Sequence, residues 1–263
     1  MCVRKRELLT SRLNEIGSSL AQSKKAVALI GLGSVGVESN RLDDYSDLDF
    51  FAVVEKGFKS HFLDNLSWLS CLCPIAYCYR NTPDGYKVLF EDGVFCEFAV
   101  FEEAELGGIP FSPGRIIWKR ASVSDALALP QRSKAAWETP SLEWSLGEAL
   151  TSLYIGLGRF RRGERLSAMR LIQCYAVERV LELFEKIDPA TWASRDSFVL
   201  ERRYEQRHPA VAEVLSAFCQ GYERSVESAE AILAFLERHF QVNAVLKEEI
   251  LKLCDPDRPV APR

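Results

Sequence analysis

The chain has 263 residues, of which 48% are hydrophobic and 27% are charged, a balance that predicts a folded protein of one or two domains. Its formal net charge of -4 argues against long nucleic acid as a partner, because such binding needs many clustered lysines and arginines. No stretch approaches the roughly 18 apolar residues of a membrane span, and the opening residues are not followed by a signal-peptide core. We therefore expect a cytoplasmic protein with no membrane partner.

The eight cysteines are scattered over apolar segments, a distribution that favours reduced thiols over a disulfide framework. Cys71, Cys73 and Cys78 are close enough in sequence to suggest a metal site. However, the chain has no second cysteine pair of zinc-binding spacing and only three histidines. We therefore do not expect structural zinc.

The first half of the chain alternates helical and strand-like patterns. Apolar residues at helical spacing predict a helix over Lys5–Leu20, and the apolar run Lys25–Leu32 predicts a strand that ends in the turn Gly33-Ser34. A second strand is expected at Ser46–Val54, where polar and apolar residues alternate. Next we expect a helical segment at Phe62–Cys71. Three strands joined by short turns follow at Ile75–Tyr79, Tyr86–Phe90 and Val94–Phe101, and one further strand at Gly114–Arg120.

The second half is helical in pattern almost throughout. Two apolar stripes predict two long helices, which a turn at Arg161–Glu164 joins. Pro209 can occupy the first turn of a third helix that runs towards Phe240, and Val245–Leu253 predicts a short last helix.

These patterns predict an α+β protein. A proline- and serine-containing linker at Pro130–Ser141 divides the two halves. We expect an N-terminal mixed-sheet domain at residues 1–136, followed by a C-terminal α-helical bundle domain at residues 137–263.

Two aspartates stand out on the predicted second strand. Asp47 and Asp49 are two residues apart, so both carboxylates project from one face of the strand while Leu48 and Phe50 enter the core. Two adjacent carboxylates repel each other unless a cation lies between them, and oxygen ligands select a hard ion such as Mg2+. We interpret the pair as a metal site, and a solvated strand end or a turn-capping pair is the alternative interpretation.

A third carboxylate, Glu97, interrupts the otherwise apolar run VFCEFAVF. A lone acid is costly to bury. If its strand lay beside the strand of Asp47 and Asp49, the three carboxylates would form one metal cluster. An acid on an edge strand that faces water would give the same sequence pattern.

The turn Gly33-Ser34 follows the first strand. Gly33 has no Cβ and lets the backbone approach a phosphate closely, and Ser34 offers a hydroxyl and an N–H. The pair alone is a weak signal. Its combination with the Asp-x-Asp strand and a later acid is far more specific.

At these residues the sequence resembles the nucleotidyltransferase superfamily of the DNA polymerase β type, and within it the antibiotic nucleotidyltransferases that modify lincosamides and aminoglycosides. GLGSVGVESNRLDDYSDLDFFAVV and GVFCEFAVF carry the resemblance, and RFRRGERLSAMRLI resembles a helical turn region of the lincosamide enzymes. The resemblance implies that Gly33 and Ser34 bind phosphate and that Asp47 and Asp49 bind metal. It implies that Glu97 binds metal or acts as a general base.

The sequence departs from the family where many members have a basic residue and a glycine soon after Gly-Ser. Val37, Glu38, Ser39 and Asn40 occupy that stretch here. We take Arg41 as the candidate nucleotide-binding residue that supplies the missing charge. Further basic candidates, each of which has an ordinary surface role as its alternative, are Arg80, Lys87, Lys119 and Arg120.

The expected function is a magnesium-dependent transfer of a nucleoside monophosphate from a nucleoside triphosphate such as ATP to a hydroxyl of a small-molecule acceptor, with release of pyrophosphate. By the resemblance, the acceptor is an antibiotic of lincosamide or aminoglycoside type and the activity confers resistance. We expect the acceptor between the two halves, near the helices of Leu142–Phe184. Homodimerisation is left open.

Three alternatives remain at this stage. The same site could act on RNA or on a protein, as a toxin-type transferase does. The chain could be a descendant that binds a nucleotide without turnover. The weakest alternative is a helical ribonuclease, which the Arg-x4-His spacing of Arg203 and His208 suggests.

Overall fold

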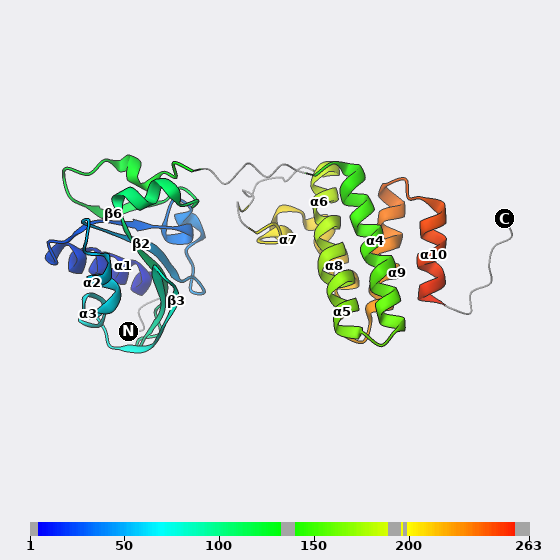
Figure 1. Ribbon diagram of the computed structural model, residues 1–263, viewed down its shortest axis with the longest axis horizontal. Helices are drawn as coiled ribbons and strands as arrows, with labels where there is room; N and C mark the ends of the chain where they lie inside the picture. Colours follow the sequence, from blue (N-terminus) through cyan, green and yellow to red (C-terminus); the bar gives the residue numbers. More distant parts are fainter. Residues whose placement is uncertain (1–4, 133–139, 189–195, 197–198, 256–263) are drawn as a thin grey trace. The chain divides into compact units, whose positions relative to one another are not determined.

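The computed structural model describes residues 5–132, 140–188, 196 and 199–255 (Figure 1). The chain separates into two compact units, Met1–Ala136 and Trp137–Arg263, which we call the N-terminal and C-terminal units. Most of the linker predicted at Pro130–Ser141 falls on residues 133–139, which lie outside the described residues.

The N-terminal unit contains a six-stranded mixed sheet, in which the strands follow the order β3-β4-β5-β2-β1-β6. Strands β2 and β5 run parallel, and the other neighbouring strands of this sheet pair antiparallel. The strands are β1 (Ala26–Gly31), β2 (Leu48–Val54), β3 (Ile75–Thr82), β4 (Gly85–Phe90), β5 (Phe95–Glu102) and β6 (Arg115–Lys119). The mixed sheet that the sequence predicts is confirmed.

Three helices cover one face of this sheet: α1 (Lys5–Gln22), α2 (Lys59–Asp64) and α3 (Ser67–Ser70) (Figure 1). Leu9, Leu13 and Leu20 on α1 are buried, as the helical spacing predicts. The rings of Phe50 on β2 and Phe98 on β5 stack beneath the helices with centroids 5.3 Å apart. Burial of each such side chain contributes about 1.5–3 kcal/mol to folding.

A smaller apolar cluster lies on the opposite face of the sheet. There Val27, Val53 and Phe101 are buried beneath two 3-10 helices, η3 (Glu103–Gly108) and η4 (Asp125–Ala128). The sequence did not predict these short helices, because a single turn carries too little periodicity to be recognised. The helical segment predicted at Phe62–Cys71 consists of two short helices, α2 and α3, and α2 begins earlier than predicted, at Lys59.

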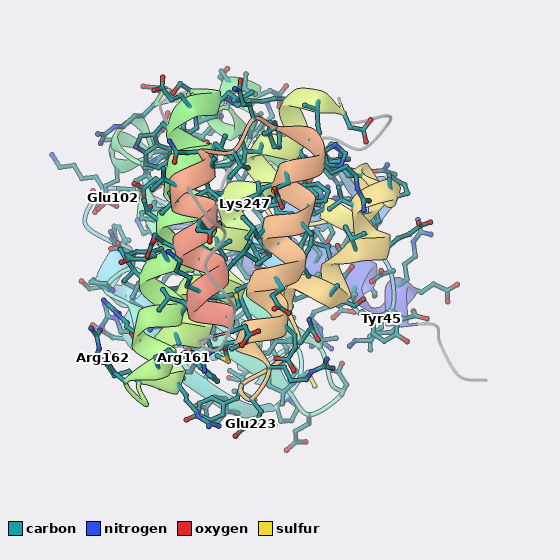
Figure 2. All side chains as sticks on the ribbon, turned by 90° about the vertical axis from the view of Figure 1, so that its right-hand side faces the viewer. Tyr45, Glu102, Arg161, Arg162, Glu223 and Lys247 are labelled. Atoms are coloured by element: carbon teal, nitrogen blue, oxygen red, sulfur yellow. The ribbon has the colours of Figure 1, made fainter. Side chains whose placement is uncertain are left out.

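The C-terminal unit is helical, as predicted. Its elements are α4 (Leu142–Arg161), α5 (Arg165–Met169), the π-helix η5 (Arg170–Ala176), α6 (Val177–Ile187), α7 (Tyr204–Arg207), α8 (Pro209–Phe218), α9 (Ser225–His239) and α10 (Ala244–Cys254). The predicted turn between the first two helices is confirmed, and Gly163 takes a φ of 82° there. Arg161, labelled in Figure 2, donates from Nε to the carbonyl oxygen of Leu253 at 2.7 Å, which fastens α4 to the end of α10.

The single third helix predicted from Pro209 towards Phe240 is wrong, because α8 ends at Phe218 and α9 begins at Ser225. Gly221 lies in the break with a φ of 94°. The side chain of Gln173 donates to the carbonyl oxygen of Gly221 at 2.7 Å and accepts from its N–H at 2.8 Å. These contacts satisfy the backbone groups that a continuous helix would have paired. Across the described residues, no helix combines the length and apolar character that a membrane span requires.

We predict that Phe50→Ala lowers the free energy of unfolding of the N-terminal unit by about 3–5 kcal/mol, because it removes a buried ring stacked on Phe98. Tyr45→Ala is the matched control, since Tyr45 is 95% exposed and should change stability by less than about 0.5 kcal/mol. Urea unfolding followed by fluorescence measures both. Equal losses for the two variants would contradict the assignment of the core to this face.

Candidate active site

The parallel pairing of β2 with β5 places the two key carboxylates side by side. Asp49 is directly opposite Glu97, and their neighbours Phe50 and Phe98 pair on the helix-covered face. Paired residues on adjacent strands project from the same face, and the strands lie about 4.8 Å apart. Asp47 lies one residue before β2 begins at Leu48, rather than on the strand as predicted.

The negative charges of Asp47 and Asp49 affect the pKa of the buried thiol of Cys96. Cys96, the residue before Glu97, is buried, and burial raises the pKa of its thiol to about 12. This pKa of about 12 already includes a lowering by Arg12 and smaller increases from the carboxylates of Asp49 and Asp47. Cys96 therefore stays protonated near neutral pH and is no candidate nucleophile.

Glu97 lies on an internal strand, because β5 is flanked by β4 and β2. The edge-strand alternative is therefore wrong. Its side chain is nevertheless 42% exposed, so the expected cost of a buried acid does not arise. The carboxylate accepts from Asn81 Nδ2 at 2.7 Å through Oε1, and Lys87 Nζ lies 3.1 Å from Oε2. The adjacent carboxylate raises the pKa of the Lys87 ammonium.

The structure brings Glu97 beside Asp49 but also gives it partners from two other strands, which the sequence analysis did not predict. In the described portion of the chain, no three His, Cys, Asp or Glu side chains are grouped closely enough to hold a metal ion. The carboxylate oxygens of Asp47 and Asp49 are suitable ligands for magnesium, which prefers hard oxygen donors. Glu97 fits that role less well, because a cation already contacts it.

The turn Gly33-Ser34 lies beside the carboxylate of Asp49. It forms the short 3-10 helix η1 (Gly33–Val35), and Gly33 has a φ of 53°, a conformation that favours glycine. A Cβ at Gly33 would lie 3.6 Å from Asp49 Oδ2. The N–H of Leu32 donates to the backbone carbonyl oxygen of Asp49 at 2.8 Å, which ties the turn to the start of β2.

Two further glycines, Gly31 and Gly36, shape this turn, although their sequence positions predicted no role for them. A Cβ at Gly31 would lie 2.5 Å from the carbonyl oxygen of Val35, and one at Gly36 would lie 2.8 Å from that of Gly31. Arg115 on β6 donates from Nε to the Gly36 carbonyl at 3.2 Å and from Nη2 to the Val35 carbonyl at 3.0 Å. The spacing of the glycines in GLGSVG could have revealed the turn, but no local pattern marks Arg115.

Arg41, the predicted nucleotide-binding residue, ends the 3-10 helix η2 (Ser39–Arg41). It forms an ion pair with Glu38, and its Nε is buried with no hydrogen-bond partner. Glu38 therefore offsets the charge that Arg41 was expected to supply. Lys119 and Arg120 lie at the other end of the sheet, where they pair with Asp125 at 3.1 Å and Glu55 at 2.6 Å.

An open row of side chains continues from the carboxylates towards the edge of the sheet. Glu97 is paired with Lys87, and Lys87 is paired with Tyr79 on β3. Next to this row, Leu89 pairs with both Tyr77 and Phe95; we call Tyr77, Leu89 and Phe95 the apolar row. The rings of Tyr77 and Tyr79 lie 6.0 Å apart, and both are exposed. The site face thus offers a partly exposed aromatic surface beside its charges.

The ribonuclease alternative finds no support in the C-terminal unit. The side chain of His208 is 0% exposed, and its ring lies 4.6 Å from that of Tyr204. Arg203 lies 3.7 Å from Asp196. A buried imidazole cannot reach a phosphodiester, so we assign no chemistry to this pair.

No protein-family profile matches the sequence, and no curated protein is significantly similar to it. Among solved structures, the chain is similar to an aminoglycoside 6-adenyltransferase from Bacillus subtilis, with 12% identity over 97% of this chain and 98% of the other and a TM-score of 0.38. It is also similar to a nucleotidyltransferase-like protein from Exiguobacterium sibiricum 255-15, with 13% identity, coverages of 95% and 80% and a TM-score of 0.35. A third is the STING-associated CdnE c-di-GMP synthase from Capnocytophaga granulosa, with 14% identity, coverages of 94% and 79% and a TM-score of 0.28.

All three TM-scores lie below 0.5, which is too low for the substrate or reaction of any of these proteins to be transferred to this chain. The α+β class rests on the mixed sheet and the helical unit themselves.

We predict that Gly31→Ala lowers the free energy of unfolding by about 1–3 kcal/mol, because its new methyl group meets the backbone of the Gly-Ser turn. Gly108→Ala is the matched control, since a Cβ there meets nothing within 4 Å. Differential scanning calorimetry compares the two variants, and hydrogen exchange at Val35 and Gly36 reports on the turn. Unchanged exchange there in Gly31→Ala would show that the turn does not depend on this close approach.

Proposed function

We propose that the N-terminal unit catalyses magnesium-dependent transfer of a nucleoside monophosphate from a nucleoside triphosphate to a hydroxyl of a small-molecule acceptor, with release of pyrophosphate. One observation carries the proposal: Asp49 is paired in register with Glu97 and lies beside the Gly33 turn. A metal-binding pair, a proton acceptor and a phosphate-binding turn are the parts that this reaction needs.

In this proposal Asp47 and Asp49 hold the magnesium ion. When bound, it would neutralise charge on the triphosphate and help to align the displacement. The N–H and hydroxyl of Ser34 bind phosphate oxygens, and the glycines of the turn let the backbone approach them. Arg115 keeps the turn in shape through its bonds to the carbonyls of Val35 and Gly36.

Glu97 takes the proton of the acceptor hydroxyl in this scheme. The acceptor oxygen forms a bond to the α-phosphorus, the bond between that phosphorus and the α,β-bridging oxygen breaks, and pyrophosphate leaves. For this step the carboxylate must lie within hydrogen-bond reach of the hydroxyl. Its 42% exposure leaves room for that approach.

The open face next to Glu97 favours an acceptor that carries a ring. The hydroxyl of the acceptor would point to Glu97, and its ring would lie on the apolar row and Tyr79. Tyr79 is two strands away from Glu97, a distance of about 10 Å. An antibiotic of lincosamide or aminoglycoside type has this chemistry, and we propose that the C-terminal unit contributes to acceptor binding.

Nucleotide binding without turnover is the second candidate. It is favoured by the pairing of Glu38 with Arg41, which removes the free positive charge expected after the Gly-Ser turn. Both candidates require metal-dependent nucleotide binding, and only the first requires release of pyrophosphate. Radiolabelled ATP and GTP, incubated with the protein, magnesium and a panel of lincosamides, aminoglycosides, tRNA and cell extract, distinguish the two and test the RNA and protein alternatives.

We predict that the protein binds a non-hydrolysable analogue of ATP or GTP and that EDTA weakens this binding at least about tenfold, because Asp47 and Asp49 would repel the triphosphate without a cation. Isothermal titration calorimetry measures both affinities. Restoration of binding by added magnesium is the control. Equal affinity with and without metal would exclude a role for the aspartate pair in nucleotide binding.

We predict that Asp47→Asn and Asp49→Asn each lower pyrophosphate release at least about 100-fold, as the loss of a metal ligand does. Glu97→Gln should lower the rate similarly and spare nucleotide binding. Asp64→Asn is the matched control, since Asp64 is exposed on α2 against the other face of the sheet. If all three site variants released pyrophosphate at nearly the wild-type rate, the active site would lie elsewhere in the protein.

A further inference from the structure

The carboxylate of Glu97 is held by side chains from two neighbouring strands. Lys87 projects from β4 directly opposite Glu97, and its Nζ lies 3.1 Å from Oε2. Asn81, at the end of β3, donates from Nδ2 to Oε1 at 2.7 Å. Both oxygens of this carboxylate therefore have a donor of their own before any ligand arrives.

This arrangement is built into the sheet and does not depend on a surface loop. The register of β4 with β5 runs without interruption from Gly85 to Leu89, so Lys87 cannot move away from Glu97 without a change of its rotamer. The β3–β4 register is irregular between Arg80 and Thr82, and this irregularity includes Asn81. Such irregularities re-aim a side chain beside a functional site.

The charged groups beside Glu97 also limit how many cations the site can hold. Asp47, Asp49 and Glu97 contribute three negative charges, and Lys87 contributes one positive charge. One divalent cation on Asp47 and Asp49 leaves the contact between Lys87 and Glu97 intact, whereas a second cation on Glu97 would have to displace the ammonium group of Lys87 from that carboxylate.

We propose that the site takes a single divalent cation, on Asp47 and Asp49, and that the ammonium group of Lys87 stands in place of a second one. Glu97 is then a proton acceptor held in position by Lys87 and Asn81, and it is not a metal ligand. The inference rests on the proposed function, because it assigns the roles of residues within that site. Lys87 is a positioning residue that acts through Glu97.

Manganese stoichiometry tests this assignment without reference to turnover. Wild-type protein is saturated with α,β-methylene-ATP or α,β-methylene-GTP, and bound Mn2+ is counted by equilibrium dialysis with electron paramagnetic resonance of the free ion. We expect one Mn2+ per chain for wild type and for Lys87→Arg, which keeps the charge. We expect two for Lys87→Met, because the freed carboxylate oxygen becomes a ligand.

Two control variants complete the experiment. Lys56→Met removes an exposed lysine of the same unit and should leave one Mn2+ bound. Asn81→Ala removes the amide while it leaves the ammonium group in place, and it should also leave one. Circular dichroism establishes that each variant is folded. If Lys87→Met does not fold, Lys87→Gln, which also removes the positive charge, takes its place with the same expected result.

The outcomes separate this inference from the proposed function. Two Mn2+ per chain in wild type, or one in a folded Lys87→Met protein, would overturn the inference and leave nucleotidyl transfer standing. A tenfold loss of nucleotide affinity in Lys87→Met would assign Lys87 to the phosphates and overturn it as well. Failure of wild type to retain any Mn2+ with either nucleotide would remove the proposed function itself.

Discussion

The parallel pairing of β2 with β5 is the constraint on which the candidate site depends. A parallel pair needs a long crossover, and here the chain from Val54 to Phe95 supplies it with two short helices and the β3–β4 hairpin. The hairpin then adds to the outer side of β5. As a result, Glu97 has an acidic neighbour, Asp49, on one side and a basic neighbour, Lys87, on the other.

The register of this pair is enforced from the opposite face of the sheet. Phe50 and Phe98 stack beneath the helices one residue beyond the paired carboxylates. A slip of one residue in either strand would turn that strand's aromatic ring to solvent and its carboxylate into the core. The hydrophobic core therefore positions the charged groups, and the stability of the sheet and the geometry of the site have one physical origin.

The Gly-Ser turn is held by a different means, close backbone packing. Gly31 and Gly36 permit contacts that any side chain would block, and Arg115 bonds two carbonyl groups of the turn from the neighbouring strand β6. The guanidinium group of Arg115 thus performs a structural task. Arg41 is likewise offset by Glu38, so the balance of charge at this site differs from that which the family resemblance implies.

The sequence by itself determined the α+β class, most helices and strands, and the features of the site that are local in the chain. The alternation around Asp49 is a period-two signal, which is readable because strand geometry places neighbouring residues on opposite faces. The glycines at the end of the first strand are equally local. The roles of these residues in binding and catalysis remain predictions.

Only the tertiary structure decided which side chains meet across strands. The contacts of Lys87 and Asn81 with Glu97 and those of Arg115 with the turn depend on pairings between distant segments, and no local pattern encodes such a partner. The break between α8 and α9 has the same cause, because Gln173, far away in the sequence, binds both backbone groups of Gly221. Helical periodicity reports which face of a segment is buried, but the partner that satisfies a backbone group is fixed only when the chain has folded.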